Sequence, residues 1–154
     1  MVRRFDREPL TGFVSAHTYQ LPAGIELLRP DGEVALVPYS EIKTVSFVKD
    51  FEGAREEFEA RLFQTRPKME GLWVRLQFRD GEQMDGVLPN NLLLLDRQGF
   101  TVTPPVPYSN NQRVFVPREA LQSVQILGVV NSPLRKKTRV KPEEDTGVQP
   151  GLFE

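Results

Sequence analysis

The chain carries the same short pattern twice, and this internal repeat restricts its fold more than any other feature. The segment VPYSEIKTVSF at 37–47 returns as VPREALQSVQI at 116–126. Each copy predicts a strand, a tight turn that begins at Pro, and a second strand of alternating apolar residues. The repeat also extends upstream, where EPLTGF aligns with EQMDGV and Gly24-Ile25 aligns with Gly99-Phe100. Two copies of one small all-β unit explain this pattern most simply.

The composition favours short elements and excludes several kinds of chemistry. The 154 residues include 13 Pro and 11 Gly, which suit short strands and tight turns. There is no Cys, so disulfides, thiolate catalysis and thiolate metal sites are excluded. His17 is the only His, and no phosphate loop, nucleophile elbow or dinucleotide fingerprint occurs. We therefore expect a protein that is not an enzyme and that binds no metal or cofactor.

Charge and hydropathy indicate a soluble protein. The formal net charge is −1, and the segment after Asn131 holds five of the 20 basic residues and four of the 21 acidic ones. The rest of the chain is slightly acidic, so binding to nucleic acid would need a local basic patch. No apolar run is long enough to span a membrane, and the first residues lack an apolar signal core. The expected location is the cytoplasm, without membrane association.

The repeat divides the chain into four parts. Residues 1–50 form the first predicted unit and 71–130 the second. Between them, 51–70 is a linker in which Phe51–Ala60 predicts a short helix and Arg61–Thr65 a strand. Within the second unit, the apolar run Leu92–Leu95 predicts a short buried strand. The final segment, 131–154, is charged and loses the apolar periodicity, which is typical of a disordered tail.

Each unit resembles the SH3-like and Sm-like small barrels. The likeness rests on five short strands, with one helical turn before the last strand. In the second unit, FRDGEQMDGVL at 78–88 is similar to the first hairpin of the Sm family, in which an Asp-Gly turn precedes a strand with a second Gly. The resemblance implies a mainly β fold: two tandem five-stranded small barrels with one short helix between them. The segments KMEGLWVR and SNNQ also resemble those of an uncharacterised bacterial family.

One strand of the second unit offers a candidate nucleic-acid surface. The segment Leu72–Arg79 alternates, so that Trp73, Arg75 and Arg79 share its polar face. Arg66 and Lys68 precede this strand. Arginines that hold phosphates beside an aromatic ring that stacks on bases are typical of single-strand binding. The alternative is that Trp73 packs between the barrels under the aliphatic stems of the arginines.

A long loop of the second unit is a second candidate surface. The stretch PPVPYSNN at 104–111 occupies the position of a short turn in the first unit. Long loops on rigid barrels often carry function, and Tyr108, Asn110, Asn111 and Arg113 would form a polar recognition tip. The alternative is that the Ser and Asn side chains cap local turns.

The end of the chain resembles a docking peptide. The last residues, QPGLFE, are similar to the bacterial sliding-clamp-binding peptide Q-x-x-L-F. Gln149, Leu152 and Phe153 match that motif, whereas Pro150 replaces the commoner Leu. The basic run at 135–141 would add attraction to DNA. The alternative is a terminus that folds back onto a barrel.

These observations predict a non-catalytic binding or adaptor module. In the preferred hypothesis it holds nucleic acid or a protein partner on the barrel surface and docks on the sliding clamp through its tail. In the alternative, the groove between the barrels binds a protein or a small ligand, and the tail is incidental. The sequence leaves the ligand and the oligomeric state open.

Overall fold

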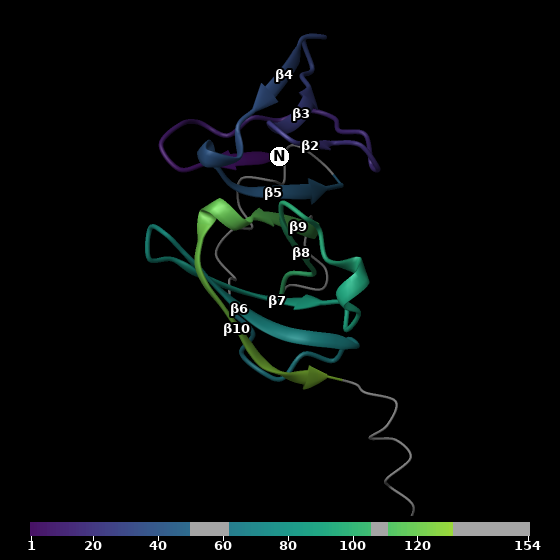
Figure 1. The fold of residues 1–154 in the computed structure, drawn as a ribbon, viewed down its shortest axis with the longest axis vertical. Coiled ribbons are helices and arrows are strands. Elements are labelled where there is room, and N and C mark those ends of the chain that lie inside the picture. Colours follow the sequence, from purple (N-terminus) through teal and green to yellow (C-terminus); the bar gives the residue numbers. More distant parts are fainter. Residues whose placement is uncertain (50–61, 106–110, 131–154) are drawn as a thin grey trace, which may run out of the picture.

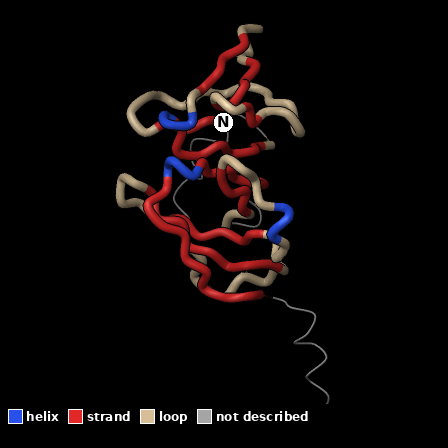
Figure 2. Tube along the Cα trace, in the orientation of Figure 1, coloured by secondary structure: helices blue, strands red, loops and turns tan. Residues whose placement is uncertain are grey.

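The structure is a computed structural model that describes residues 1–49, 62–105 and 111–130. The described part is mainly β, as predicted, and strands dominate its trace (Figure 2). The helical elements among these residues are three single 3₁₀ turns: η1 (Tyr39–Glu41), η4 (Leu92–Leu94) and η5 (Arg118–Ala120).

In the described part of the chain, ten strands form three antiparallel sheets (Figure 1). Their orders are β1-β5-β9-β8, β10-β6-β7 and β2-β3-β4. The strands are β1 (Val2–Arg4), β2 (Gln20–Leu21), β3 (Gly24–Leu28), β4 (Val34–Val37), β5 (Ile42–Val48), β6 (Gly71–Phe78), β7 (Gln83–Leu88), β8 (Gly99–Val102), β9 (Asn111–Pro117) and β10 (Leu121–Val130).

The two copies of the repeated sequence adopt the same local structure. Pro38 and Pro117 both have extended backbone angles, with φ of −62° and −61°, and each directly precedes a single 3₁₀ turn. Pro fixes φ near these values, so it prepares the chain for the turn. The turn leads into β5 in the first copy and into β10 in the second. The sequence repeat is therefore a structural repeat.

Strand pairing follows the same plan in both copies. In the first copy Val2 pairs with Val45, and at the equivalent positions of the second copy Leu76 pairs with Val124. Isolated bridges correspond in the same way. The bridge between Phe13 and Leu28 matches the one between Val87 and Thr103. The two copies therefore share a pairing plan, but the counterpart of β7 in the first copy, residues 10–13, is not a strand and pairs only through isolated bridges at Leu10 and Phe13.

The two copies are not separate closed barrels, contrary to the prediction. None of the three sheets closes on itself. The cause is a pairing between the copies: β5 of the first repeat pairs with β9 of the second, with Val45 opposite Phe115 and Ser46 opposite Val114. Because this edge of β5 is taken by β9, it cannot close a barrel with β4.

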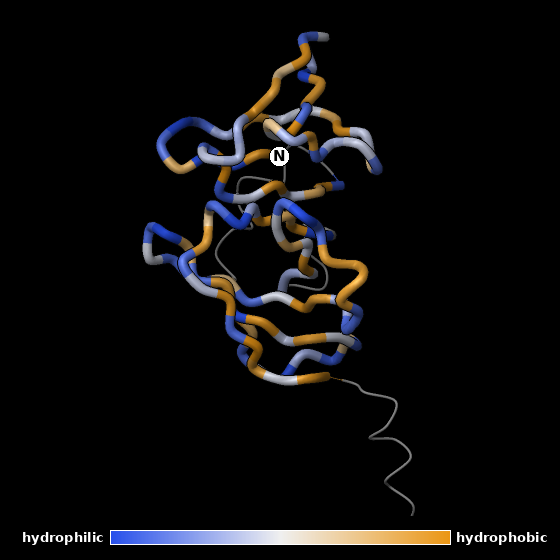
Figure 3. Tube along the Cα trace, viewed as in Figure 1, coloured by the Kyte–Doolittle hydropathy of each residue, from blue (hydrophilic) through white to orange (hydrophobic). Residues whose placement is uncertain are grey.

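Each repeat has its own hydrophobic core, and each core takes one aromatic ring from the other repeat. The first core contains Phe115 of β9. Phe5 of the first repeat packs against the second core. The hydropathy along the trace alternates within the strands, as expected for strands with one buried face (Figure 3). The exchange of rings joins the repeats into one packed structure.

Two local predictions are wrong. Residues 62–65 form no strand, and Leu92–Leu95 is not a buried strand. Instead, the Asn91 side-chain oxygen accepts a hydrogen bond of 3.0 Å from the Leu93 N–H and starts the turn η4. An Asn at this position favours a helical turn over a strand. Leu93 is consequently 93% exposed. The predicted helix at 51–60 and the predicted tail at 131–154 lie outside the described residues.

Candidate functional site

The side chains of Trp73 and Arg75 are held by a buried carboxylate. Asp85 of β7 has no exposed surface and lies opposite Arg75 of β6. The Arg75 guanidinium donates to both carboxylate oxygens, with Nε–Oδ1 of 2.8 Å and Nη2–Oδ2 of 3.1 Å. The backbone N–H of Phe63 and the indole N–H of Trp73 also donate to Oδ2, at 3.0 and 3.4 Å. The carboxylate is thus paired and hydrogen-bonded, as a buried charge requires.

The nucleic-acid hypothesis requires Trp73 and Arg75 to be available for bases and phosphates, but both donate hydrogen bonds to Asp85. The Phe63 ring packs edge-on against Trp73, with 6.3 Å between centroids. The hydrogen bond to Asp85 raises the pKa of Arg75, which holds its charge in this pair. The sequence favours a structural role for the clustered acids Asp80, Glu82 and Asp85, but it does not identify Arg75 and Trp73 as the partners of Asp85.

The remaining predicted basic residues lie near opposite ends of β6. Arg79 follows the last residue of β6, donates to the Ser40 carbonyl at 2.8 Å and lies 4.0 Å from the centroid of the Phe5 ring. Arg66 donates to the carbonyl of Val129, which pairs with Leu72 at the start of the strand. Lys68 is exposed. The structure therefore does not bring the five predicted residues into one patch.

The other predicted site residues lie outside the described residues. These are Tyr108 and Asn110 of the loop, and Gln149, Leu152 and Phe153 of the terminal peptide. Asn111 begins β9, but its side chain is not among those described.

A hollow of about 490 Å³ lies at the junction of the two repeats, and we call it the junction hollow. Its volume falls in the usual range for small-molecule sites, roughly 300–1,000 Å³. Both repeats supply its wall, including η4 and its flanks. Its lining residues are Ala16, His17, Tyr19, Gln20, Phe47, Val87, Leu88, Pro89, Leu94, Leu95, Asp96, Thr101, Val102, Thr103 and Arg113.

Several polar side chains converge on the junction hollow. The Thr101 hydroxyl donates to Asp96 Oδ2 at 2.6 Å, and the Gln20 amide donates to the Tyr19 hydroxyl at 2.9 Å. Burial raises the pKa of Tyr19, so its hydroxyl stays protonated at neutral pH. The Arg113 guanidinium lies 5.4 Å from the centroid of the Phe47 ring. The wall thus offers a cation, a carboxylate and neutral hydroxyl and amide groups beside apolar surface.

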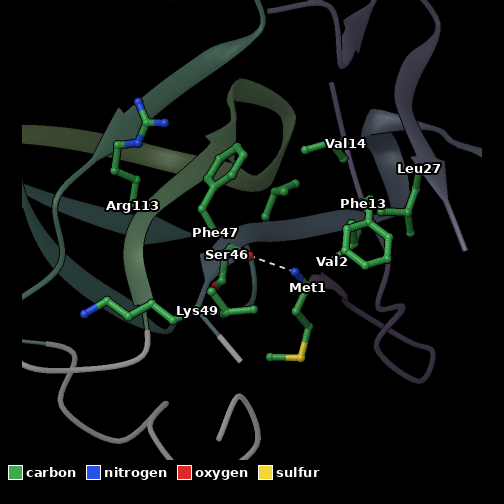
Figure 4. A pocket seen from close by; sticks show the side chains of 12 residues that line it. Met1, Val2, Phe13, Val14, Leu27, Ser46, Phe47, Lys49 and Arg113 are labelled. Carbon is green, nitrogen blue, oxygen red and sulfur yellow. Dashed lines mark hydrogen bonds between the residues drawn. The ribbon is translucent and has the colours of Figure 1, made fainter. Parts of the chain in front are cut away.

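A second hollow, of about 420 Å³, lies next to the N-terminal strand (Figure 4). Phe47 and Arg113 line both hollows. In the figure, Phe47, Arg113 and Lys49 lie on one side and Phe13 and Leu27 on the other.

The amino group of Met1 is fixed in this second hollow. It donates to the Ser46 carbonyl at 2.7 Å. Burial, together with the charge of Arg3, lowers the pKa of the amino group to about 6.

The sequence predicted the junction only as a groove between barrels; it singled out Arg113 for the long loop and His17 as the only His, but did not place them together. The lining of the junction hollow comes from segments that are distant in sequence, and they meet because β5 pairs with β9. The described residues contain no group of three or more His, Asp or Glu side chains suited to a metal ion. Their helical segments include none with the length and apolarity needed to cross a membrane.

The fold and the junction define a mainly β protein built from two joined repeats. The chain belongs to a family of unknown function (DUF6982), whose model matches residues 1–128. No curated protein matches the chain significantly, and no solved structure does. The family match covers the two repeats and ends before the terminal peptide.

Proposed function

We propose that the protein is a non-catalytic binding module that takes a small ligand in the junction hollow. The observation that carries this proposal is the convergence of Arg113, Asp96 and Thr101 on a hollow of about 490 Å³ that both repeats line. Binding sites for small molecules are concave and mostly apolar, with a few polar groups that fix orientation. The junction hollow is concave and places polar groups beside apolar side chains, and its lining is more polar than apolar.

The charges of the wall indicate the chemistry of the ligand. No carboxylate among the described residues forms an ion pair with Arg113. The Arg113 guanidinium is therefore suited to an anionic group of the ligand, such as a carboxylate. Asp96 accepts one hydrogen bond from Thr101 and retains capacity for a ligand donor. Phe47 and Val102 provide apolar contact for the rest of the molecule. We therefore expect a small anion with hydrogen-bond donors and an apolar part.

A titration followed by amide resonances tests this function. The probes are small carboxylates, small amines and neutral amides, added separately to the full-length protein. We expect carboxylates to shift the amide resonances of Tyr19, Thr101 and Arg113, and Arg113→Gln to weaken this binding several-fold. If no probe class shifts these resonances at millimolar concentration, the proposal is wrong.

Arg118 provides a matched control for Arg113. Its guanidinium also lies over a ring, 4.8 Å from the centroid of Phe100, and donates to the Arg97 carbonyl at 3.1 Å. It does not line the junction hollow. Arg118→Gln thus removes a similar cation over an aromatic ring and is expected to leave carboxylate binding unchanged. Equal weakening by both substitutions would mean that the effect is not specific to the hollow.

Clamp docking is a second candidate function, favoured by the terminal sequence alone. Gln149, Leu152 and Phe153 match the Q-x-x-L-F motif. A short peptide on a tether can bind a groove independently of the domain that carries it. The test is binding to a bacterial sliding clamp by the full chain and by Leu152→Ala/Phe153→Ala. Equal binding by both proteins would contradict this function.

Nucleic-acid binding is supported by fewer residues than the sequence predicts. Arg75 is paired with Asp85, and Arg66 and Arg79 donate to backbone carbonyls. Arg66, Lys68 and Arg79 are exposed, and Lys68 is the one of these three for which no hydrogen bond to a carbonyl is described. Titration with labelled single-stranded DNA and RNA at two salt concentrations tests this function, since binding through phosphates weakens as salt rises.

A further inference from the structure

We propose that copies of this chain associate head to tail, with β10 of one copy pairing antiparallel with β4 of the next. The proposal concerns a surface distinct from the junction hollow. It follows from the internal repeat: the pairing of β5 with β9 has an equivalent pair of strands, β10 and β4, that are not paired with each other.

The occupied interface is the pairing of β5 with β9. By the repeat, positions 34–47 correspond to positions 113–126, so β4 is the counterpart of β9 and β10 is the counterpart of β5. Within one chain, the last strand of the first repeat pairs with the fourth strand of the second. The complementary pair, β10 and β4, has no such partner among the described residues. Within residues 1–49, 62–105 and 111–130, β10 pairs with β6 alone and β4 with β3 alone.

The two free edges lie in different parts of the molecule (Figure 1). The hairpin of β3 and β4 is at the top of the view, whereas β10 runs from η5, near the middle, down to the lower border of the described residues. They cannot meet within one chain. A second copy is therefore the natural occupant of each edge.

The free edges expose apolar side chains: Leu36 is exposed where its counterpart Phe115 is buried, and Val34 is exposed like its counterpart Arg113. On the occupied edges, Val45, Ser46 and Phe115 are buried. On the free edges, Val34 is 66% exposed, Leu36 is 51% exposed and Ile126 is 65% exposed. Exposed apolar side chains on an unpaired strand are a template for another strand unless charge or Pro protects the edge. Neither strand carries a charged residue.

The repeat also fixes the register of the proposed pairing. Val45 pairs with Phe115, and Phe47 pairs with Arg113. The equivalent pairs between copies are Val124 with Leu36 and Ile126 with Val34. Of these four side chains, Val34, Leu36 and Ile126 are exposed in the single chain, whereas Val124 is half-buried against the second core. Cross-strand apolar pairs of this kind stabilise a sheet.

One polar position provides a further check on the register. In the occupied interface, the Lys43 ammonium forms ion pairs with Asp80 and Glu82. The counterpart of Lys43 is Gln122, and the counterparts of the two acids are Asp6 and Glu8. Gln122 of one copy would therefore face Asp6 and Glu8 of the next. Gln122→Lys is expected to create ion pairs like those of Lys43 and tighten the association.

Because the interface joins two different edges, it is heterologous and repeats from copy to copy. Such an interface gives a ring if the rotation closes and a filament if it does not. In either case, each copy contributes β4 to one neighbour and β10 to the other. A symmetric dimer would instead use the same edge twice.

Sedimentation velocity over a wide range of concentrations tests the proposal with two edge variants of the full chain. Val34→Lys and Ile126→Lys each place a charge on one free edge at an exposed position. We expect each variant alone to dissociate at concentrations where the wild type is associated, a weakening of about tenfold or more. An equimolar mixture is expected to form heterodimers, because one variant retains β10 and the other retains β4. Leu93→Lys, an exposed leucine of η4, is the control.

Every outcome bears on the proposal. Loss of association by Ile126→Lys but not by Val34→Lys would indicate a symmetric dimer and overturn it. A wild type that stays monomeric even with Gln122→Lys would also overturn it. Circular dichroism of each variant establishes that it is folded. As a second measurement, Val34→Cys and Ile126→Cys proteins are mixed under oxidation, and we expect a mixed disulfide in a chain that has no other Cys.

Discussion

The ammonium of Lys43 in the first repeat lies 2.5 Å from the carboxylate of Asp80 in the second. Its neighbour Glu82 forms a second ion pair with the same ammonium. The Lys43 side chain is only 10% exposed and lies between the rings of Phe5 and Phe78, 5.7 and 5.1 Å from their centroids. This lysine therefore fixes the first repeat against the β6–β7 turn, alongside the pairing of β5 with β9.

Removing the two carboxylates is expected to destabilise the fold more than removing the lysine. Asp80→Asn/Glu82→Gln leaves a buried ammonium without an anion, at a cost on the order of 3 kcal/mol. Lys43→Met leaves two carboxylates that are partly exposed and can be hydrated, so its cost is smaller. Urea unfolding of the two variants measures the difference. Equal free energies of unfolding, or a larger loss for Lys43→Met, would contradict the role assigned to the ion pairs.

The ion pair between Lys43 and Asp80 is expected to make the free energy of unfolding depend on pH in the acid range. Burial by itself raises the pKa of Asp80, but hydrogen bonds from Lys43 and from the Glu82 N–H outweigh it and lower the pKa below 3.8. The stabilisation is therefore present above pH 3.8 and is lost as the pH falls through the folded-state pKa. We expect Asp80→Asn to reduce the slope of unfolding free energy against pH below about pH 4, measured by urea unfolding. An unchanged slope would show that Asp80 does not carry the dependence.

We expect replacement of the buried Asp85 to reduce the stability of the second repeat strongly. Asp85→Ala leaves Arg75 and the Trp73 indole N–H without their buried acceptor, which costs roughly 3–4 kcal/mol. Trp73 is the only Trp, so its fluorescence reports this site directly. We expect a lower midpoint of unfolding and a shifted emission maximum. If both stay at the wild-type values, the network does not hold the strand.

Two glycines test the equivalence of the repeats. A Cβ added to Gly24 would lie 2.2 Å from the Val37 carbonyl oxygen, and one added to Gly99 would lie 2.1 Å from the Val116 carbonyl oxygen. Both clashes are with backbone, so Gly24→Ala and Gly99→Ala should each cost about 1–3 kcal/mol. At Gly128 the nearest atoms are 3.9 Å away, and Gly128→Ala is the control. A large cost at only one of the two glycines would contradict the equivalence.

The sequence repeat predicts the local structure well because turn chemistry is local. Pro38 and Pro117 direct the same turn, and the Asp-Gly pairs at 31–32 and 80–81 form turns in which Gly adopts φ of +90°. The position of Gly12 and Gly86 before equivalent bridges also follows from the alignment. These features depend only on residues that are close in sequence.

The partner of β5 does not follow from the sequence. An alternating apolar strand can pair with β4 of its own repeat or with β9 of the other, and its residues do not distinguish these partners. The junction hollow depends on that choice, because its wall combines Tyr19 and Phe47 with Thr101 and Arg113. The burial of Asp85 also depends on residues that are distant in sequence. Its carboxylate oxygens accept hydrogen bonds from Arg75 of β6 and from the Phe63 N–H.

Cross-strand nuclear Overhauser effects at β5 test the central claim most directly. The claim is that the repeats are joined by hydrogen-bonded strands, which leaves β4 and β10 as free edges. We expect backbone contacts between β5 and β9 in the register that places Val45 opposite Phe115 and Ser46 opposite Val114. Contacts of β5 with β4 instead would mean two closed barrels, and would contradict both the origin of the junction hollow and the proposed head-to-tail pairing.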